Sequence, residues 1–172
     1  NNQSIELLNM GSSSVNMTGW QFIIYAGNGT TEKTYTFPSF TLPNGGYVVL
    51  NKGTGSNTST NLYIGDYSTT WASNGNGAAL LKTGNIGIDF VRWGSSTLMP
   101  PNVTGWSGQN PSGPASGQNL GRDPLTGDTG DGGDWSAQPP TLGTINQPIR
   151  PANDDFANNI LVPGLPYSAS LP

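Results

Sequence analysis

The chain has 172 residues, of which six are Lys or Arg and ten are Asp or Glu, and it contains neither His nor Cys. This composition excludes disulfides, thiol nucleophiles and histidine general bases, and with them Ser-His-Asp chemistry within the chain. Six cations against ten anions argue against a phosphate backbone as a partner, so we expect no nucleic acid. The longest apolar runs have four or five residues, far short of the roughly 20 that a membrane span requires.

Turn-forming and aromatic residues characterise the rest of the composition. The chain has 25 Gly and 14 Pro, and only 33% of its residues are hydrophobic, so its five Trp, five Phe and six Tyr supply much of the apolar surface. Each aromatic side chain buries about 150–250 Å² in a core, and disordered chains lack such residues. Together with the low charge, this composition favours an extracellular all-β protein with short strands and many turns.

Short β-prone runs follow one another along the first half of the chain. They recur every 10–15 residues with turn residues between them, whereas the periodicity of an amphipathic helix is nearly absent. Several short strands at this spacing predict a β-sandwich or a barrel. The predicted strands are 5–8, 20–25, 35–37, 40–42, 47–50, 62–64, 78–81 and 86–93.

The sequence changes character after the last of these strands. Residues 95–121 are rich in Pro and Gly and are interpreted as a long surface loop, and an acidic, glycine-rich stretch follows at 126–134. Residues 139–146 are interpreted as a segment that closes the domain. We therefore expect one domain over residues 1–147, and a linker with an extended, strand-forming tail over residues 148–172.

Several segments together form a family pattern. They are IELLN at 5–9, TGW at 18–20, TLPNGGYVVL at 41–50, ALLK with IDFV at 79–91, and LGR, DW and PTLG between 120 and 146. In their order and spacing they resemble the lamin tail domain, which occurs in nuclear lamins and in many secreted bacterial proteins. The resemblance covers about residues 4–146. It implies an all-β, immunoglobulin-like β-sandwich with a structural or interaction role and no enzymatic activity.

The start of the chain departs from this family pattern. The family usually begins with one more strand before the segment at 5–9, and only residues 1–4 precede that segment here. A sandwich that lacks an edge strand exposes unpaired N–H and C=O groups beside an apolar slot. We therefore expect an open acceptor edge at Ile5 and Leu7.

The tail is the second departure. It resembles the start of another bacterial extracellular β-module, and Leu165, Tyr167, Ala169 and Leu171 alternate on one face of the expected strand. By strand exchange, the tail of one copy would complete the sandwich of the next, giving a homopolymer on the cell surface or outside the cell. The alternative hypothesis is a carbohydrate- or surface-binding module cut from a larger multi-domain secreted protein, with neighbouring domains as its partners.

The acidic stretch is a candidate calcium site and the one cofactor site that we consider. Asp128, Asp131 and Asp134 follow Asp123 at short spacing with glycines between them. Ca²⁺ prefers six to eight oxygen ligands on a flexible loop, although the pattern of an EF-hand is missing. The alternative is that these carboxylates cap turns and need no metal.

Two tryptophans are candidates for stacking on sugar rings. Trp71 and Trp106 lie in predicted loops, whereas Trp20 and Trp93 lie in predicted strands and are expected in the core. Because so few residues are hydrophobic, a core position is also a reasonable alternative for the two loop tryptophans.

N-linked modification is a further possibility for an extracellular chain. Five Asn-x-Ser/Thr sequons are present, and several arise by chance in a chain so rich in Asn, Ser and Thr. The candidate glycosylation sites are Asn2, Asn16, Asn28, Asn57 and Asn102.

Overall fold

The computed structural model describes residues 3–148 except for 69–74, 76, 100–101, 104 and 126, and it gives only the backbone of 78–82. The regular secondary structure of the described residues is almost entirely β, as predicted, and its helical element is a three-residue 3₁₀ turn, η1. The elements are β1 (Ser4–Leu8), β2 (Val15–Asn16), β3 (Gln21–Tyr25), β4 (Thr31–Thr36), β5 (Thr41–Leu42), β6 (Tyr47–Asn51), β7 (Asn61–Tyr63), β8 (Gly77–Lys82), β9 (Ile86–Arg92), β10 (Asn119–Arg122), η1 (Gly132–Asp134) and β11 (Trp135–Gln138).

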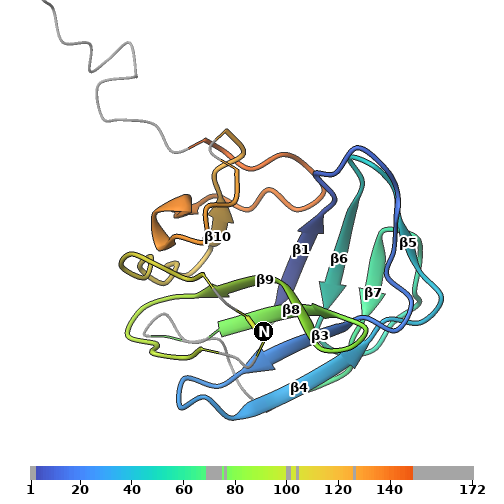
Figure 1. The fold of residues 1–172 in the computed structure, drawn as a ribbon, viewed down its shortest axis with the longest axis horizontal. Helices are drawn as coiled ribbons and strands as arrows, with labels where there is room; N and C mark the ends of the chain where they lie inside the picture. The colour runs from blue at the N-terminus through green and yellow to red at the C-terminus, as the bar shows by residue number, and fades with distance from the viewer. Residues whose placement is uncertain are drawn as a thin grey trace, which may run out of the picture.

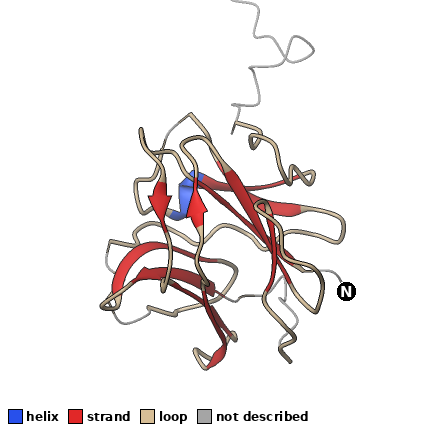
Figure 2. Cartoon of the chain, turned by 90° about the vertical axis from the view of Figure 1, so that its right-hand side faces the viewer, coloured by secondary structure: helices blue, strands red, loops and turns tan. Residues whose placement is uncertain are grey.

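Two sheets form the sandwich (Figure 1). One sheet has four antiparallel strands in the order β4-β3-β8-β9, and the other has three strands in the order β1-β6-β7. In the second sheet β1 runs antiparallel to β6, whereas β7 runs parallel to it. The turned view shows the strands of the two sheets in separate layers (Figure 2). The architecture is therefore an immunoglobulin-like β-sandwich, which confirms the predicted fold class.

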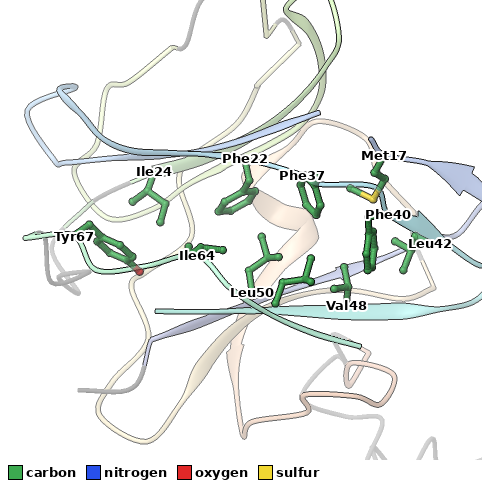
Figure 3. Close-up of a cluster of buried hydrophobic side chains, with 11 residues drawn as sticks. Met17, Phe22, Ile24, Phe37, Phe40, Leu42, Val48, Leu50, Ile64 and Tyr67 are labelled. Atoms are coloured by element: carbon green, nitrogen blue, oxygen red, sulfur yellow. The ribbon is translucent and has the colours of Figure 1, made fainter. Parts of the chain in front are cut away.

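Alternating residues of the facing strands fill the space between the sheets. Phe22 and Ile24 of β3 point toward Val48 and Leu50 of β6, since every second residue of a strand faces the same side. Loop residues between the strands complete this core, in which Phe37 is 2% exposed (Figure 3). The buried members are Met17, Phe22, Ile24, Phe37, Phe40, Leu42, Val48, Leu50, Leu62, Ile64 and Tyr67.

Two shorter pairs of strands complete the described fold. β2 pairs with β5 at one end of the sandwich, and β10 pairs with β11 in the part of the chain that follows the long loop. Within the described residues, no helix is both long and apolar enough to cross a membrane.

Candidate functional site

Strand β1 lies at the edge of the three-stranded sheet. It pairs with β6 on one side, and the described part of the chain places no strand on its other side. Such an edge presents a row of backbone donors and acceptors to which another chain can pair. The predicted acceptor residues Ile5 and Leu7 both belong to this strand.

Two hydrogen bonds at the ends of β1 show which backbone groups face outward. The N–H of Lys52 donates to the carbonyl of Gln3 at 3.0 Å, and the N–H of Asn9 donates to the carbonyl of Gly46 at 3.0 Å. Because backbone groups alternate along a strand and the register is unbroken, the odd-numbered residues of β1 face β6. The residues whose N–H and C=O groups point away from β6 are Ser4, Glu6 and Leu8.

The apolar side chains of β1 are incompletely covered. Ile5 and Leu7 point into the sandwich and pack against its core, but both are only partly buried. Their partners across the strand pair, Leu50 and Val48, are fully buried. The core-facing side chains of β1 are therefore less buried than those of β6, and an additional strand beside β1 would cover more of their apolar surface.

The edge at β4 differs from the edge at β1. Its pairing with β3 is interrupted by a register shift between Ile24 and Tyr25, and its sequence carries the charged residues Glu32 and Lys33. Bulges and charges of this kind protect sheet edges from pairing with other chains. Ser68 also donates a 2.8 Å hydrogen bond to the Glu32 carboxylate.

The edges at β7 and β9 carry local hydrogen bonds. The N–H of Tyr63, at the end of β7, donates to the side-chain oxygen of Asn57 at 2.8 Å. The N–H of Gly87 in β9 donates to the carbonyl of Asn102 at 2.9 Å. Neighbouring loops thus occupy part of both edges, whereas β1 has a whole row of outward backbone groups.

One loop approaches β1 from the C-terminal part of the domain. We call residues 139–148 the strap, and its tip lies near the end of β1 (Figure 1). The N–H of Gly143 donates to the Glu6 carboxylate, and the Asn146 amide donates to the carbonyl of Arg122 at 3.1 Å. Burial raises the pKa of the Glu6 carboxyl, and the bond from Gly143 offsets part of this effect. Leu142 and Ile145 of the strap are exposed, so polar contacts hold it in place.

Asn9 fixes the end of β1. Its side chain is 8% exposed, and its amide donates to the carbonyls of Ser13, Leu42 and Pro43 at 2.9–3.1 Å. Its side-chain oxygen accepts from the N–H of Gly11 at 3.0 Å. A buried polar group is costly unless it is paired, so these bonds hold the turn after β1 in one arrangement.

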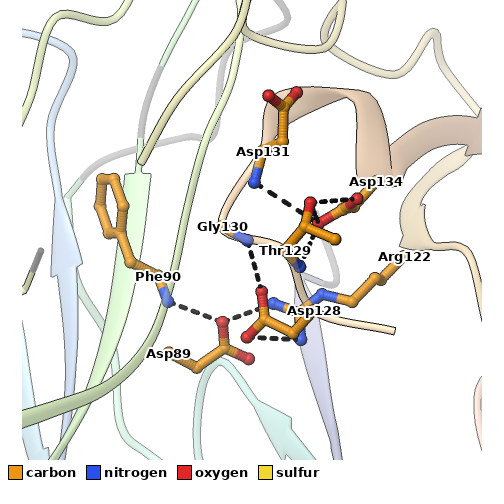
Figure 4. A network of polar contacts seen from close by, with 8 residues as sticks. All are labelled: Asp89, Phe90, Arg122, Asp128, Thr129, Gly130, Asp131 and Asp134. Atoms are coloured by element: carbon orange, nitrogen blue, oxygen red, sulfur yellow. Dashed lines mark hydrogen bonds and ion pairs between the residues drawn. The ribbon is translucent and has the colours of Figure 1, made fainter. Parts of the chain in front are cut away.

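The predicted calcium residues act as caps (Figure 4). Asp131 caps η1 through the N–H of Gly133, and Asp128 accepts from the N–H of Gly130. Asp134 is 6% exposed and accepts from the N–H and hydroxyl of Thr129. No three Asp, Glu, His or Cys side chains form a group that could hold a metal ion within the described ranges. In the described residues these carboxylates act as the capping alternative expects, and the calcium site stays a prediction.

The Asp134 carboxylate links stability to pH. Burial by itself raises its pKa, but the hydrogen bonds from Thr129 and Asp131, with the charge of Arg122, lower the net value. A carboxyl group with a lowered pKa stabilises the fold above its unfolded pKa of about 4, and this contribution is lost as the pH falls through the folded value. Between about pH 5 and pH 2, we therefore expect Asp134→Asn to flatten the fall in the free energy of unfolding. Urea titrations of both proteins measure this, with Asp128→Asn as the control.

Arg122 joins β10 to the edge of the four-stranded sheet. Its guanidinium contacts the carboxylates of Asp89 in β9 at 2.5 Å and Asp128 at 3.3 Å, and lies 4.6 Å from the ring of Trp135. Burial raises the pKa of the Asp89 carboxyl, and the charge of Arg122 only partly offsets this. The ion pair with Arg122 thus favours the ionised form of Asp89 against the effect of burial.

Removing Arg122 leaves the Asp89 carboxylate without its main partner. We expect Arg122→Met to cost about 2 kcal/mol in the free energy of unfolding, less than for a fully buried pair because the Asp89 side chain is 35% exposed. Urea unfolding measures the cost. Adding Asp89→Asn to this variant should recover part of the loss, since no unpaired charge remains. A double variant as unstable as the sum of the two single variants would contradict the pairing.

Trp106 packs against the outer face of the four-stranded sheet. Its ring lies 5.6 Å from that of Phe90 in an edge-to-face arrangement, and its indole N–H donates to Asn110 at 3.2 Å. With Leu98 and Val103 it covers a second buried cluster of Ile23, Tyr25 and Phe90. Trp106 thus packs against the domain while staying partly exposed, and its stacking on sugar rings stays a prediction. Trp71 lies outside the described residues.

The sequons remain predictions. The described candidates Asn16, Asn28, Asn57 and Asn102 are all exposed, whereas Asn2 lies outside the described residues. Several of their side chains support turns, as when Asn28 accepts from the N–H of Thr30 at 3.0 Å.

Comparison with known proteins agrees with this geometry. A family model described as the Lamin Tail Domain matches residues 1–95, which include every strand of the two main sheets. A search of curated proteins found no match. The family match covers more than half of the chain and includes the open edge at β1. The chain therefore belongs to the lamin tail domain family, whose members are structural, immunoglobulin-like domains.

Proposed function

We propose that this chain is a non-catalytic structural module that polymerises by strand exchange. In this proposal, the C-terminal tail of one copy adds a strand to the β1 edge of the next copy. The observation that supports it most is the outward row of backbone groups at Ser4, Glu6 and Leu8, beside the partly buried Ile5 and Leu7. Main-chain hydrogen bonds give such added strands their affinity, and alternating side chains give them specificity.

The tail has the pattern that a donor strand needs. Its residues lie outside the described part of the chain, but their sequence places Leu165, Tyr167, Ala169 and Leu171 on one face of an extended strand. Residues 165–172 carry no charge, so their burial beside Ile5 and Leu7 leaves no ion without a partner.

Assembly of this kind has a defined symmetry. One copy uses its tail and the other uses its edge, so the contact is heterologous and produces an open filament unless the rotation closes a ring. A low charge and many Asn, Ser, Thr and Gly residues suit dense packing of copies at a cell surface or outside the cell, where we place this module.

A pair of matched variants tests the proposal. Tyr167→Asp with Leu165→Asp places charges on the apolar face of the tail, and Ser168→Asp with Ser170→Asp places the same charges on the opposite face. Sedimentation velocity and electron microscopy of the full chain should show assemblies for the unchanged protein and the serine variant. The apolar-face variant should be monomeric. An unchanged chain that stays monomeric at high concentration, or an apolar-face variant that still assembles, contradicts strand exchange.

A further inference from the structure

We infer that the tail strand runs parallel to β1 when it joins the sheet. This inference rests on the proposed function and specifies how the donor strand pairs. It combines the hydrogen bonding of β7, the direction of the β1 backbone and the positions of two prolines in the tail.

Strand β7 shows how a parallel strand pairs at the other edge of the same sheet. The N–H of Val49 donates to the carbonyl of Thr60 at 2.8 Å, and the N–H of Ile64 donates to the carbonyl of Asn51 at 3.0 Å. Residues 60, 62 and 64 therefore direct their backbone groups toward β6, and of these Leu62 and Ile64 have side chains buried in the core. In this parallel pair, the core-facing residues of the added strand are the ones that pair.

The antiparallel pair in the sheet shows the complementary arrangement. Ile5 of β1 lies opposite Leu50 of β6, both side chains face the core, and their backbone groups point toward each other. In a strand of L-residues that runs in a given direction, the face to which a side chain points determines the edge to which the N–H and C=O of the same residue point. If the strand runs the other way while the same side chains still face the core, these backbone groups point to the opposite edge. At the outward side of β1, a parallel strand therefore pairs through its core-facing residues, and an antiparallel strand through its solvent-facing residues.

The prolines of the tail distinguish these two orientations. With Leu165, Tyr167, Ala169 and Leu171 facing the core, the solvent-facing residues are Pro166, Ser168, Ser170 and Pro172. Proline has no N–H, so an antiparallel tail would offer β1 only the two serine donors. A parallel tail would offer four donors, one from each core-facing residue.

The same orientation explains how growth of the sheet ends. In the parallel arrangement, Pro166 and Pro172 lie on the new outer edge of the sheet. Proline is tolerated on edge strands and hinders the pairing of a further strand. Each copy then adds one strand to its neighbour, and the pairing of further strands at this edge is hindered.

Two adjacent proline substitutions test the orientation directly. Ala169→Pro removes an N–H that pairs only in the parallel arrangement, and Ser170→Pro removes one that pairs only in the antiparallel arrangement. We expect Ala169→Pro to weaken self-association about tenfold and Ser170→Pro to change it less than about twofold, measured by sedimentation equilibrium. The reverse result overturns the inference but leaves strand exchange intact. An unchanged chain that does not self-associate contradicts the proposed function instead.

Cross-linking gives an independent test, because the chain has no native cysteine. Ser170→Cys is combined either with Leu8→Cys or with Ser4→Cys, and these two β1 positions lie about 13 Å apart along the strand. A disulfide needs Cα atoms within about 7 Å, so only one combination should link copies under mild oxidation. Parallel addition predicts linkage through Leu8→Cys. Linkage through Ser4→Cys overturns the orientation, and linkage through neither overturns the alignment that places Ser170 beside an end of β1.

Discussion

Phe37→Ala is expected to lower the free energy of unfolding by about 3–5 kcal/mol. Phe37 is 2% exposed, and its ring lies 5.3 Å from that of Tyr35 and 5.9 Å from that of Phe40. The substitution removes apolar contacts and leaves a cavity between the sheets that the surrounding strands fill only in part. Because domains are stable by about 5–15 kcal/mol, the variant should be close to unfolding at physiological temperature. Urea denaturation followed by tryptophan fluorescence measures the loss.

An exposed apolar residue provides the control for this prediction. Leu125 is 79% exposed, so Leu125→Ala should change the free energy of unfolding by less than about 0.5 kcal/mol. Phe37→Leu should lie between the two, since it keeps part of the apolar volume. A loss below about 1 kcal/mol for Phe37→Ala would show that the core does not depend on this ring.

Proline substitutions at neighbouring positions of β1 should separate folding from assembly. The N–H of Ile5 faces β6, so Ile5→Pro removes a hydrogen bond of the strand pair and should destabilise the domain by about 3 kcal/mol. The N–H of Glu6 faces outward, so Glu6→Pro should leave most of the stability and prevent the tail from pairing. Thermal melting and sedimentation velocity on the same samples report the two effects.

Glu6→Ala distinguishes the backbone from the carboxylate in that experiment. It removes the acceptor of the bond from Gly143 and keeps the outward N–H, so the variant should still assemble. If Glu6→Pro assembles as well as the unchanged protein, the acceptor is not the outward side of β1. If Glu6→Ala fails to assemble, the contact between the strap and β1 is itself necessary.

Local sequence patterns predicted much of the sandwich. The apolar runs that became β1, β3, β6 and β9 were identified within a residue or two, because alternation and turn residues encode such strands locally. β4 begins at Thr31, earlier than predicted, since its first residues are polar and lie on an exposed edge. Neither β10 nor β11 is predicted from the sequence, because neither has an apolar run. β10 begins within the stretch interpreted as a surface loop, and β11 lies between the acidic stretch and the predicted closing segment.

The contacts around the candidate site could not be predicted in the same way. Asp89 and Arg122 are 33 residues apart, and only the folded topology brings them together. Trp106 resembled an exposed loop residue because the sequence does not show that its loop folds back onto Phe90. The open edge at β1, in contrast, was predicted from a family pattern and not from the residues of β1 alone.

The anchoring of the strap has a mechanical consequence. In the proposed filament, tension on the tail would enter the described structure near Gln147, whose N–H donates to Gln138 at 2.7 Å, next to the bond between Asn146 and Arg122. The ion pair between Arg122 and Asp89 would transmit that force to the four-stranded sheet. The strand received from a neighbouring copy would pull on the other sheet, at β1. A filament under tension would therefore stretch each sandwich across its core, and the packing around Phe37 would limit the force that the filament withstands.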